Sequence, residues 1–297
     1  MAATFFPKMT AEAELSDADI ESKELRLRAM MQAYGKVLVA YSGGVDSSYL
    51  SLIARQELGS SAVCILGISP SVSEMQRTEA RAFADDFELN FREIETEELN
   101  DPHYQANPTN RCYFCKSELY ARLREIAVEL NIDNVVDGTN ADDLKGHRPG
   151  MAAAKENAVT SPLAELGFNK KAVRILSKRH GVKGWDKPAS PCLSSRIAYG
   201  VPVTIERLSQ IERAEAVLRS KGFHEFRVRS HGDRARIELS KIDMPRFFEN
   251  EHGGEIIREI EKIGFRNVTL DPEGFRSGSM HQQLILEKSR DGKSDGR

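Results

Sequence analysis

The chain has 297 residues, and its 42 Lys and Arg against 45 Asp and Glu give a formal net charge of −3. Hydrophobic residues make up 40% and charged residues 29%, a composition typical of globular proteins that excludes collagen-like, disordered and membrane-embedded classes. No apolar run reaches the roughly 18 residues of a membrane span, and residues 1–14 lack a secretory signal pattern, so we expect a cytoplasmic protein with no membrane partner. The near-neutral charge also disfavours nucleic acid as a partner.

Helices and strands alternate along the first part of the chain. In order, we expect a helix at 21–34, a strand at 37–40, a helix at 47–58, a strand at 62–68, a helix at 75–87, a strand at 91–94, a helix at 119–130 and a strand at 134–136. This alternation predicts an α/β fold with a doubly wound, mostly parallel sheet. Ligands of such sheets bind at the carboxyl ends of the strands, so functional residues are expected there.

The pattern changes near residue 204. We expect a helix at 205–221, strands at 223–229 and 234–239, a helix at 244–263 and a strand at 267–270, which together make a second, smaller α+β domain. Two domains also suit the length, at about 150 residues each. We therefore divide the chain into a flexible N-terminus at 1–20, an α/β domain at 21–200, an α+β domain at 201–286 and a frayed tail at 287–297.

One face of the two consecutive strands in the second domain is basic. Arg227 and Arg229 alternate with apolar residues in the first of them, and Arg234 and Arg236 do so in the second. A solvated face with carboxylate neighbours and a contact surface for an anionic ligand or another subunit both fit this pattern.

A glycine turn joins the first strand to the helix that follows. Its glycines let the backbone approach a ligand, and the next amides and hydroxyls point at the start of a helix, where anions are stabilised. The Gly-Lys-[Ser/Thr] ending of a Walker A loop is missing, and an ordinary turn with a helix cap is the alternative to a phosphate site. The residues that we assign to phosphate binding are Ser42, Gly43, Gly44, Asp46, Ser47 and Ser48.

A second strand ends in an acidic turn, residues 137–143. Magnesium prefers carboxylates together with phosphate oxygens, so Asp46 with Asp142 or Asp143 could hold an ion that bridges a triphosphate. Helix capping is the alternative role for at least one of these aspartates. We also assign Gly138 and Thr139 of this turn to nucleotide binding.

Three of the four cysteines form a pattern of their own. Cys112 and Cys115 make a C-x-x-C pair, and Cys192 follows about 80 residues later, whereas Cys64 lies in an apolar strand and is expected in the core. A lone C-x-x-C could be a redox pair. Three thiolates could hold a [4Fe-4S] cluster and leave one iron open to another ligand, whereas structural zinc usually takes four ligands.

The turn sequence Ser-Gly-Gly-Val-Asp-Ser resembles the PP-loop of the ATP pyrophosphatases, which implies cleavage of ATP between its α- and β-phosphates. Together with residues 137–143, 147–150, 161–165, 187–196 and 271–279, it resembles the LarE family over roughly residues 20–285. That family comprises ATP-dependent sulfur transferases of nickel-pincer nucleotide biosynthesis. The resemblance implies that a carboxylate of pyridinium-3,5-biscarboxylic acid mononucleotide is adenylated and then converted to a thiocarboxylate.

The resemblance also implies roles for individual residues. Lys116, Arg148 and Arg196 are candidate clamps for anionic groups, with surface ion pairs as the alternative. Arg229 and Arg276 could hold the phosphate of the substrate. Glu165 could complete the metal site or orient the substrate, with a plain surface carboxylate as the alternative. The family further suggests trimers or hexamers built through the second domain.

Two routes for sulfur follow from the cysteines. In one branch of the family the motif cysteine, here Cys192, gives up its own sulfur and becomes dehydroalanine. This chain also has Cys112 and Cys115, as in the branch that resembles cluster-dependent enzymes, and a C-x-x-C pair has no role in a sacrificial reaction. We therefore favour a [4Fe-4S] cluster held by the three thiols, with the sacrificial route as the alternative.

Other function classes remain open at this point. A tRNA-thiolating PP-loop enzyme would share the loop and the cysteines, but it usually needs a basic surface that the charge balance does not indicate. A nucleotide-binding module without chemistry would explain only the loop. An amidotransferase-type synthetase would need an ammonia source, and no glutaminase domain fits within the length.

Overall fold

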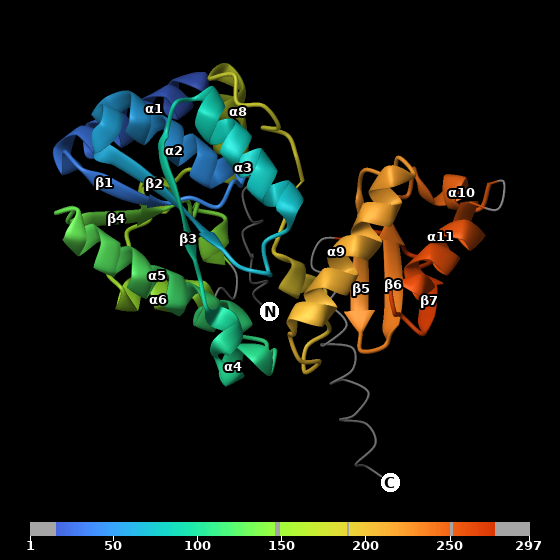
Figure 1. Ribbon diagram of the computed structural model, residues 1–297. Coiled ribbons are helices and arrows are strands. Elements are labelled where there is room, and N and C mark those ends of the chain that lie inside the picture. Colours follow the sequence, from blue (N-terminus) through green and yellow to red (C-terminus); the bar gives the residue numbers. More distant parts are fainter. Residues whose placement is uncertain (1–15, 146–148, 189, 250–251, 277–297) are drawn as a thin grey trace, which may run out of the picture.

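The computed structural model describes residues 16–145, 149–188, 190–249 and 252–276. Figure 1 shows an α/β unit in blue to green, beside a second unit in orange that carries a smaller sheet. The predicted fold class is confirmed: a parallel sheet with helices on both faces stands next to a small second sheet. None of the described helices is long and apolar enough to cross a membrane.

The sheet of the first unit has the strand order β3-β2-β1-β4, and all its pairs are parallel. Its central strands are apolar and buried because helices cover both faces, as expected of parallel sheets. In Figure 1, α2, α3 and α8 lie above this sheet and α5 and α6 lie below it. The strands are β1 (Val37–Ala40), β2 (Ala62–Ile68), β3 (Asn90–Glu95) and β4 (Asn134–Asp137).

Helices α1 and α3 of the first unit begin at side-chain caps. Ser16 and Ser73 each form a capping box, at the start of α1 and α3 respectively. The larger helices are α1 (Asp17–Tyr34), α2 (Val45–Leu58), α3 (Glu74–Asp86), α5 (Arg111–Glu129), α6 (Pro149–Glu156) and α8 (Lys170–Arg179), and the short ones are α4 (Pro102–Gln105), α7 (Pro162–Glu165) and the 3₁₀ turn η4 (Leu193–Arg196).

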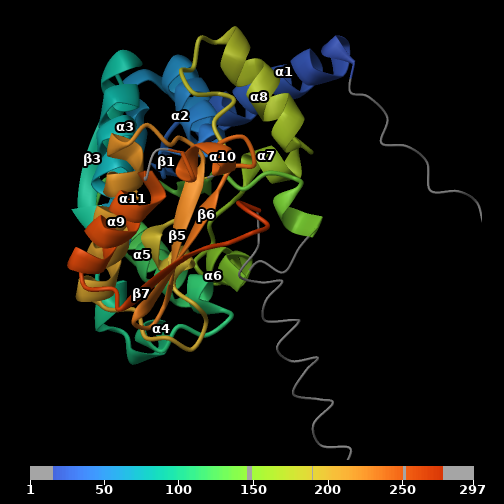
Figure 2. The same cartoon turned by 90° about the vertical axis from the view of Figure 1, so that its right-hand side faces the viewer.

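The second unit is a three-stranded sheet, order β5-β6-β7, with β5 and β6 antiparallel and β6 and β7 parallel. Figure 2 shows this sheet toward the viewer, in front of the first unit. Helices α9 and α11 contact each other and the sheet. The elements are α9 (Ile205–Ser220), β5 (Phe226–His231), β6 (Arg234–Leu239), α10 (Met244–Phe247), α11 (His252–Lys262) and β7 (Asn267–Leu270).

The two units share a core. Tyr104 of α4 and Leu193 of η4 are buried in the same apolar cluster as the inner residues of the second sheet. Ile197 also forms a parallel bridge with Ser230 of β5. The segment that carries Cys192 is therefore already part of the contact between the units, ahead of the boundary that we predict at residue 201.

Several predicted boundaries are corrected. Helix α1 begins at Asp17 and buries Ile20, so residues 17–20 are helical and not a flexible segment. Helix α5 begins at Arg111, eight residues before the predicted start at residue 119. The single helix predicted at 244–263 is instead α10 and α11; a Cβ on Gly253 would stand 2.5 Å from the backbone oxygen of Phe247, so this glycine permits close packing of α11 on α10.

Candidate functional site

The glycine turn sits between β1 and α2, as the sequence predicts. Gly43 has φ +73°, and a Cβ there would stand 3.1 Å from the Cβ of Ala80 in α3, so the turn requires glycine. Inside the turn the Ser47 hydroxyl donates to the backbone oxygen of Gly44 at 3.0 Å and accepts from the Ser42 amide at 3.1 Å. The start of α2 therefore faces the carboxyl ends of the strands, where an anion is stabilised.

The acidic turn after β4 lies directly against this loop. A Cβ on Gly138 would stand 2.6 Å from the backbone nitrogen of Ser47, so the two segments are in backbone contact. Thr139 donates to Asp137, from its amide at 3.1 Å and from its hydroxyl at 2.9 Å. The two segments that the sequence assigns to nucleotide binding thus lie against each other at the carboxyl ends of β1 and β4.

Asp46 lies in the first turn of α2 and has a lysine partner that the sequence did not reveal. Lys170 Nζ lies 2.5 Å from Asp46 Oδ2, whereas Asp46 Oδ1 is buried without a hydrogen-bond partner in the described part of the chain. Burial raises the pKa of Asp46, Lys170 opposes this shift, and Asp143 adds to it. A buried, unpartnered carboxylate oxygen fits a metal ligand.

The other two candidate magnesium ligands are near Asp46 but already have partners. Asp142 accepts a hydrogen bond from the Lys170 amide at 2.8 Å and from Lys145 at 2.9 Å, which hold the pKa of Asp142 below its ordinary value. Asp143 accepts from the Asn140 amide at 3.2 Å. Glu165 is exposed at the end of α7.

Lys116, whose side chain is 41% exposed, joins a polar network with Tyr120 and the buried Asp137. Its Nζ donates to the Tyr120 hydroxyl at 2.8 Å and lies 3.8 Å from Asp137 Oδ2. Asp137 also accepts from Tyr120 at 2.7 Å and from Ser161 at 2.7 Å. Although burial opposes it, Tyr120 and Asp137 raise the pKa of Lys116, so the ammonium stays charged at the edge of the site.

The three predicted cysteines lie on two segments, the start of α5 and the residue before η4. Cys112 and Cys115 lie in the first turns of α5, with Cys115 Sγ 3.5 Å from the backbone oxygen of Cys112, and Cys192 immediately precedes η4. The Cys112 thiol and burial raise the pKa of Cys115, and Cys192 adds to that shift. Arg111 is buried beside them; although burial opposes it, Cys192 and Cys112 raise the pKa of this guanidinium.

The segment around Cys192 is held from the first unit. The Leu193 amide donates to the backbone oxygen of Ser71 at 2.8 Å, and the Gln76 side chain of α3 donates to that of Ser190 at 2.7 Å. The Tyr104 hydroxyl bridges the Ser71 and Ser194 hydroxyls at 2.8 and 2.6 Å. The loop between β2 and α3 thus fixes the position of the third cysteine.

Arg196 points into the protein at the same segment. Its buried guanidinium pairs with Glu215 at 3.1 Å and donates to the backbone oxygens of Pro191 and Cys192. These contacts hold the segment that carries Cys192, whereas the predicted contact of Arg196 with an anionic group stays a prediction.

The arginines of the second unit have acidic neighbours. Arg229 is buried and pairs with Glu238 at 2.9 Å, and it also donates to the backbone oxygen of Ser195. Arg276 pairs with Asp271 at 3.5 Å and with a second carboxylate, that of Glu273. The sequence analysis offered a solvated face with carboxylate neighbours or a contact surface for an anion or another subunit. The carboxylate neighbours are present, but Arg229 is buried and not solvated. Arg148 lies outside the described residues.

The fit of a metal or cluster depends on its donors. In the described ranges, no three His, Cys, Asp or Glu side chains are spaced as ligands of a single ion. In an iron–sulfur cluster each thiolate binds a different iron, so its ligands need not be spaced like those of one ion. Three thiols near the buried Arg111 suit the donor chemistry of such a cluster.

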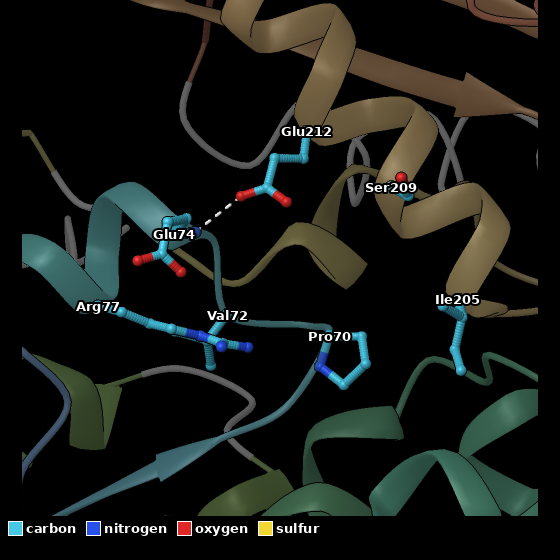
Figure 3. Close-up of a pocket in the computed structure, with 7 residues that line it drawn as sticks. All are labelled: Pro70, Val72, Glu74, Arg77, Ile205, Ser209 and Glu212. Carbon is cyan, nitrogen blue, oxygen red and sulfur yellow. Dashed lines mark hydrogen bonds between the residues drawn. The ribbon is translucent and has the colours of Figure 1, made fainter.

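A small pocket lies apart from these residues, between the start of α3 and α9. Figure 3 shows Glu212 of α9 reaching the backbone nitrogen of Glu74, a hydrogen bond of 2.7 Å. The cavity measures about 150 Å³ and is lined by Pro70, Val72, Glu74, Arg77, Ile205, Ser209 and Glu212. Glu212 therefore caps α3 and links the two units, and none of the predicted site residues lines this cavity.

Sequence reasoning missed Lys170, Tyr104 and Arg111. Lys170 follows the helix cap Asn169 and lies 124 residues from its partner Asp46, so no local pattern marks it. Arg111 directly precedes Cys112. Because a basic residue stabilises a neighbouring thiolate, its position beside the C-x-x-C pair could have marked it in the sequence.

Comparison with known proteins adds to this geometry. The NAD synthase family matches residues 20–141, which include the glycine turn and the acidic turn up to residue 141. An uncharacterised protein of Synechocystis sp. is 44% identical over 265 residues, which cover 89% of this chain and 99% of that protein. The pyridinium-3,5-bisthiocarboxylic acid mononucleotide synthase of Lactiplantibacillus plantarum is 35% identical over 268 residues, or 90% of this chain and 96% of that enzyme.

The match to the synthase covers 90% of this chain, so it extends beyond the first unit into the second. The glycine turn at the end of β1 is the PP-loop of the first unit. Since similarity of this extent shows the family, the chain belongs to the LarE family of PP-loop enzymes and is an ATP-using enzyme.

Proposed function

We propose that the chain adenylates a carboxylate of pyridinium-3,5-biscarboxylic acid mononucleotide and replaces one of its oxygens by sulfur, in nickel-pincer nucleotide biosynthesis. The observation that carries the proposal is the position of Gln76. A Cβ on Gly43 of the PP-loop would stand 3.8 Å from the backbone oxygen of Gln76, and the Gln76 side chain donates to the backbone of Ser190 near Cys192. The first turn of α3 thus contacts both the PP-loop and the segment that carries Cys192.

Adenylation solves a chemical problem. A carboxylate is a poor acyl donor because its leaving group would be oxide. In the proposed first step a substrate carboxylate oxygen bonds to the α-phosphorus of ATP, and the bond from that phosphorus to the bridging oxygen of pyrophosphate breaks. Amides of the PP-loop and the N-terminus of α2 stabilise the charge that develops on pyrophosphate.

Magnesium would be held by Asp46 through its buried Oδ1, with Asp142 or Asp143. When bound, it neutralises charge on the phosphates. Lys116, anchored by Tyr120, presents a permanent positive charge near the acidic turn and supports an anionic acyl adenylate there.

The second step forms a carbon–sulfur bond at the acyl carbon and expels AMP. Cys112, Cys115 and Cys192 would together hold a [4Fe-4S] cluster, which supplies an open iron position for exogenous sulfide. The buried Arg111 stabilises negative charge on sulfur at this place. In the alternative, Cys192 attacks with its own thiolate, and cleavage of its Cβ–S bond with loss of the α-proton leaves dehydroalanine.

The nucleotide products test the adenylation step. The wild-type chain incubated with ATP, magnesium and substrate is expected to make AMP and pyrophosphate, resolved by ion-exchange chromatography. Asp46→Asn, which keeps the size of the side chain but removes its charge, is expected to lose this activity, because a bound ion contributes several kcal/mol to the stabilisation of the transition state. Formation of ADP by the wild-type chain would refute the proposed cleavage site.

A further inference from the structure

Lys170 forms an ion pair with Asp46, the carboxylate of the PP-loop. It is the first residue of α8, and Asn169 caps this helix by accepting a hydrogen bond from the Ala172 amide at 2.8 Å. The backbone amide of Lys170 donates to Asp142 Oδ2 at 2.8 Å, and its side chain reaches Asp46 Oδ2 at 2.5 Å. A rigid helix start therefore holds the lysine against both acidic segments of the ATP site.

The ion pair between Lys170 and Asp46 is short, and both side chains are partly exposed to solvent. The side chain of Lys170 is 32% exposed and that of Asp46 is 18% exposed. A lysine ammonium is a point charge on a flexible four-carbon stem, so it can change partner without movement of the helix. The pair can therefore open while α8 stays in place.

Two cations cannot both be close neighbours of one carboxylate without mutual repulsion. Asp46 has one buried oxygen without a partner in the described residues and one oxygen occupied by Lys170, in the first turn of a helix that faces a phosphate site. When a divalent ion binds this carboxylate, the ammonium of Lys170 is repelled. The nearest anion that arrives with the ion is the phosphate chain of the nucleotide.

We propose that Lys170 exchanges partners during the reaction: it holds Asp46 before nucleotide binds, and it contacts the departing pyrophosphate when Asp46 is taken by the metal. This assignment rests on the proposed cleavage of ATP between its α- and β-phosphates. The lysine would keep the PP-loop carboxylate in place in the empty site and stabilise the leaving group in the filled one.

Binding measurements on the full chain test this exchange without turnover. Titration calorimetry with inorganic pyrophosphate and saturating Mg²⁺ is expected to show at least tenfold weaker binding for Lys170→Gln, because a charge-assisted contact is lost. Titration with Mn²⁺ alone is expected to show tighter binding for the same variant, because the competing ammonium is gone. Lys171→Gln, in the same helix turn and exposed, makes the same charge change and is expected to match the wild-type chain in both titrations.

Lys170→Arg is the control for a folding defect, because it replaces the same side chain but keeps the charge. It is expected to retain pyrophosphate binding within a few-fold of the wild-type chain. Pyrophosphate affinity of Lys170→Gln within twofold of Lys171→Gln would overturn the phosphate contact. Unchanged Mn²⁺ affinity would overturn the exchange at Asp46. Both readouts are independent of the nucleotide product, so formation of ADP by the wild-type chain would refute the proposed function separately.

Discussion

At the scale of single residues, one buried hydroxyl connects the segments around the cysteines. Tyr104 of α4 bridges Ser71, after β2, and Ser194, two residues beyond Cys192, and the two serine hydroxyls also bond to each other at 3.0 Å. All three side chains are buried. Since a buried polar group that loses its partner keeps the full cost of desolvation, this triangle fixes a single arrangement of the three segments.

Tyr104→Phe is therefore expected to loosen the Cys192 segment while leaving the ATP loop intact. We expect a loss of about 1–3 kcal/mol in unfolding free energy, from the two serine hydroxyls that lose a partner. Hydrogen exchange at Leu193, whose amide bonds to Ser71, should become faster. The rate of thiocarboxylate formation should fall more than the rate of AMP formation.

Tyr49→Phe is the matched control. Tyr49 is equally buried and its hydroxyl lies 3.2 Å from Glu24, but it belongs to the core near α1 and not to the cysteine site. It should lower stability without changing exchange at Leu193. Equal exchange at Leu193 in Tyr104→Phe and the wild-type chain would show that the hydroxyl does not position the segment.

Candidate residues that belong to short motifs could be named from the sequence. Residues whose partners lie far away along the chain could not. Asp46 and the three cysteines stand in short local motifs, so the amino-acid sequence alone makes them candidates. Lys170 and Tyr104 act on groups 124 and 90 residues away, on Asp46 and Ser194. Only the fold brings such pairs together, and one sequence carries no record of that contact.

At the scale of elements, the start of α2 and the end of β4 can approach closely because Gly138 has no side chain. A Cβ on Gly138 would stand 2.6 Å from the nitrogen and 2.7 Å from the Cα of Ser47. Both opposing atoms are backbone, so the clash cannot be relieved by a rotamer change. The acidic turn would have to move away from the PP-loop.

Gly138→Ala is expected to cost about 1–3 kcal/mol of stability, as overpacked sites do, and to weaken ATP binding because the carboxylates move away from the phosphates. Urea unfolding and ATP titration measure the two effects. Gly254→Ala in α11 is the control, since its Cβ would meet only the flexible end of Arg258 at 3.4 Å and alanine favours a helix. Wild-type ATP affinity in Gly138→Ala would contradict the close fit of the two segments.

Most elements followed from hydrophobic periodicity, and the errors have physical causes. The parallel strands are short apolar runs between turn residues, and β1 and β2 begin and end where predicted. The start of α5 was missed because residues 111–118 are mixed polar and aromatic and show no clear amphipathic period. As a result, Cys112 and Cys115 lay outside the predicted helix, whereas they lie in the first turns of α5.

At the scale of the whole molecule, the cysteine site lies where the two units meet. Glu212 of α9 caps α3, Arg196 pairs with Glu215 of α9, and Tyr104 packs into the core of the second unit. We also propose a trimer or hexamer built through the second unit, which light scattering of the purified chain would test.

The most direct test of the account follows sulfur and nucleotide in one reaction. The chain is reconstituted anaerobically with iron and sulfide, supplied with ATP and the biscarboxylate mononucleotide, and its products are quantified by mass spectrometry together with the peptide at 187–196. We expect thiocarboxylate in excess of enzyme, AMP formed with each thiocarboxylate, and an unchanged Cys192. Dehydroalanine at position 192 with a single turnover would contradict the cluster route, and absence of thiocarboxylate despite AMP formation would contradict sulfur transfer itself.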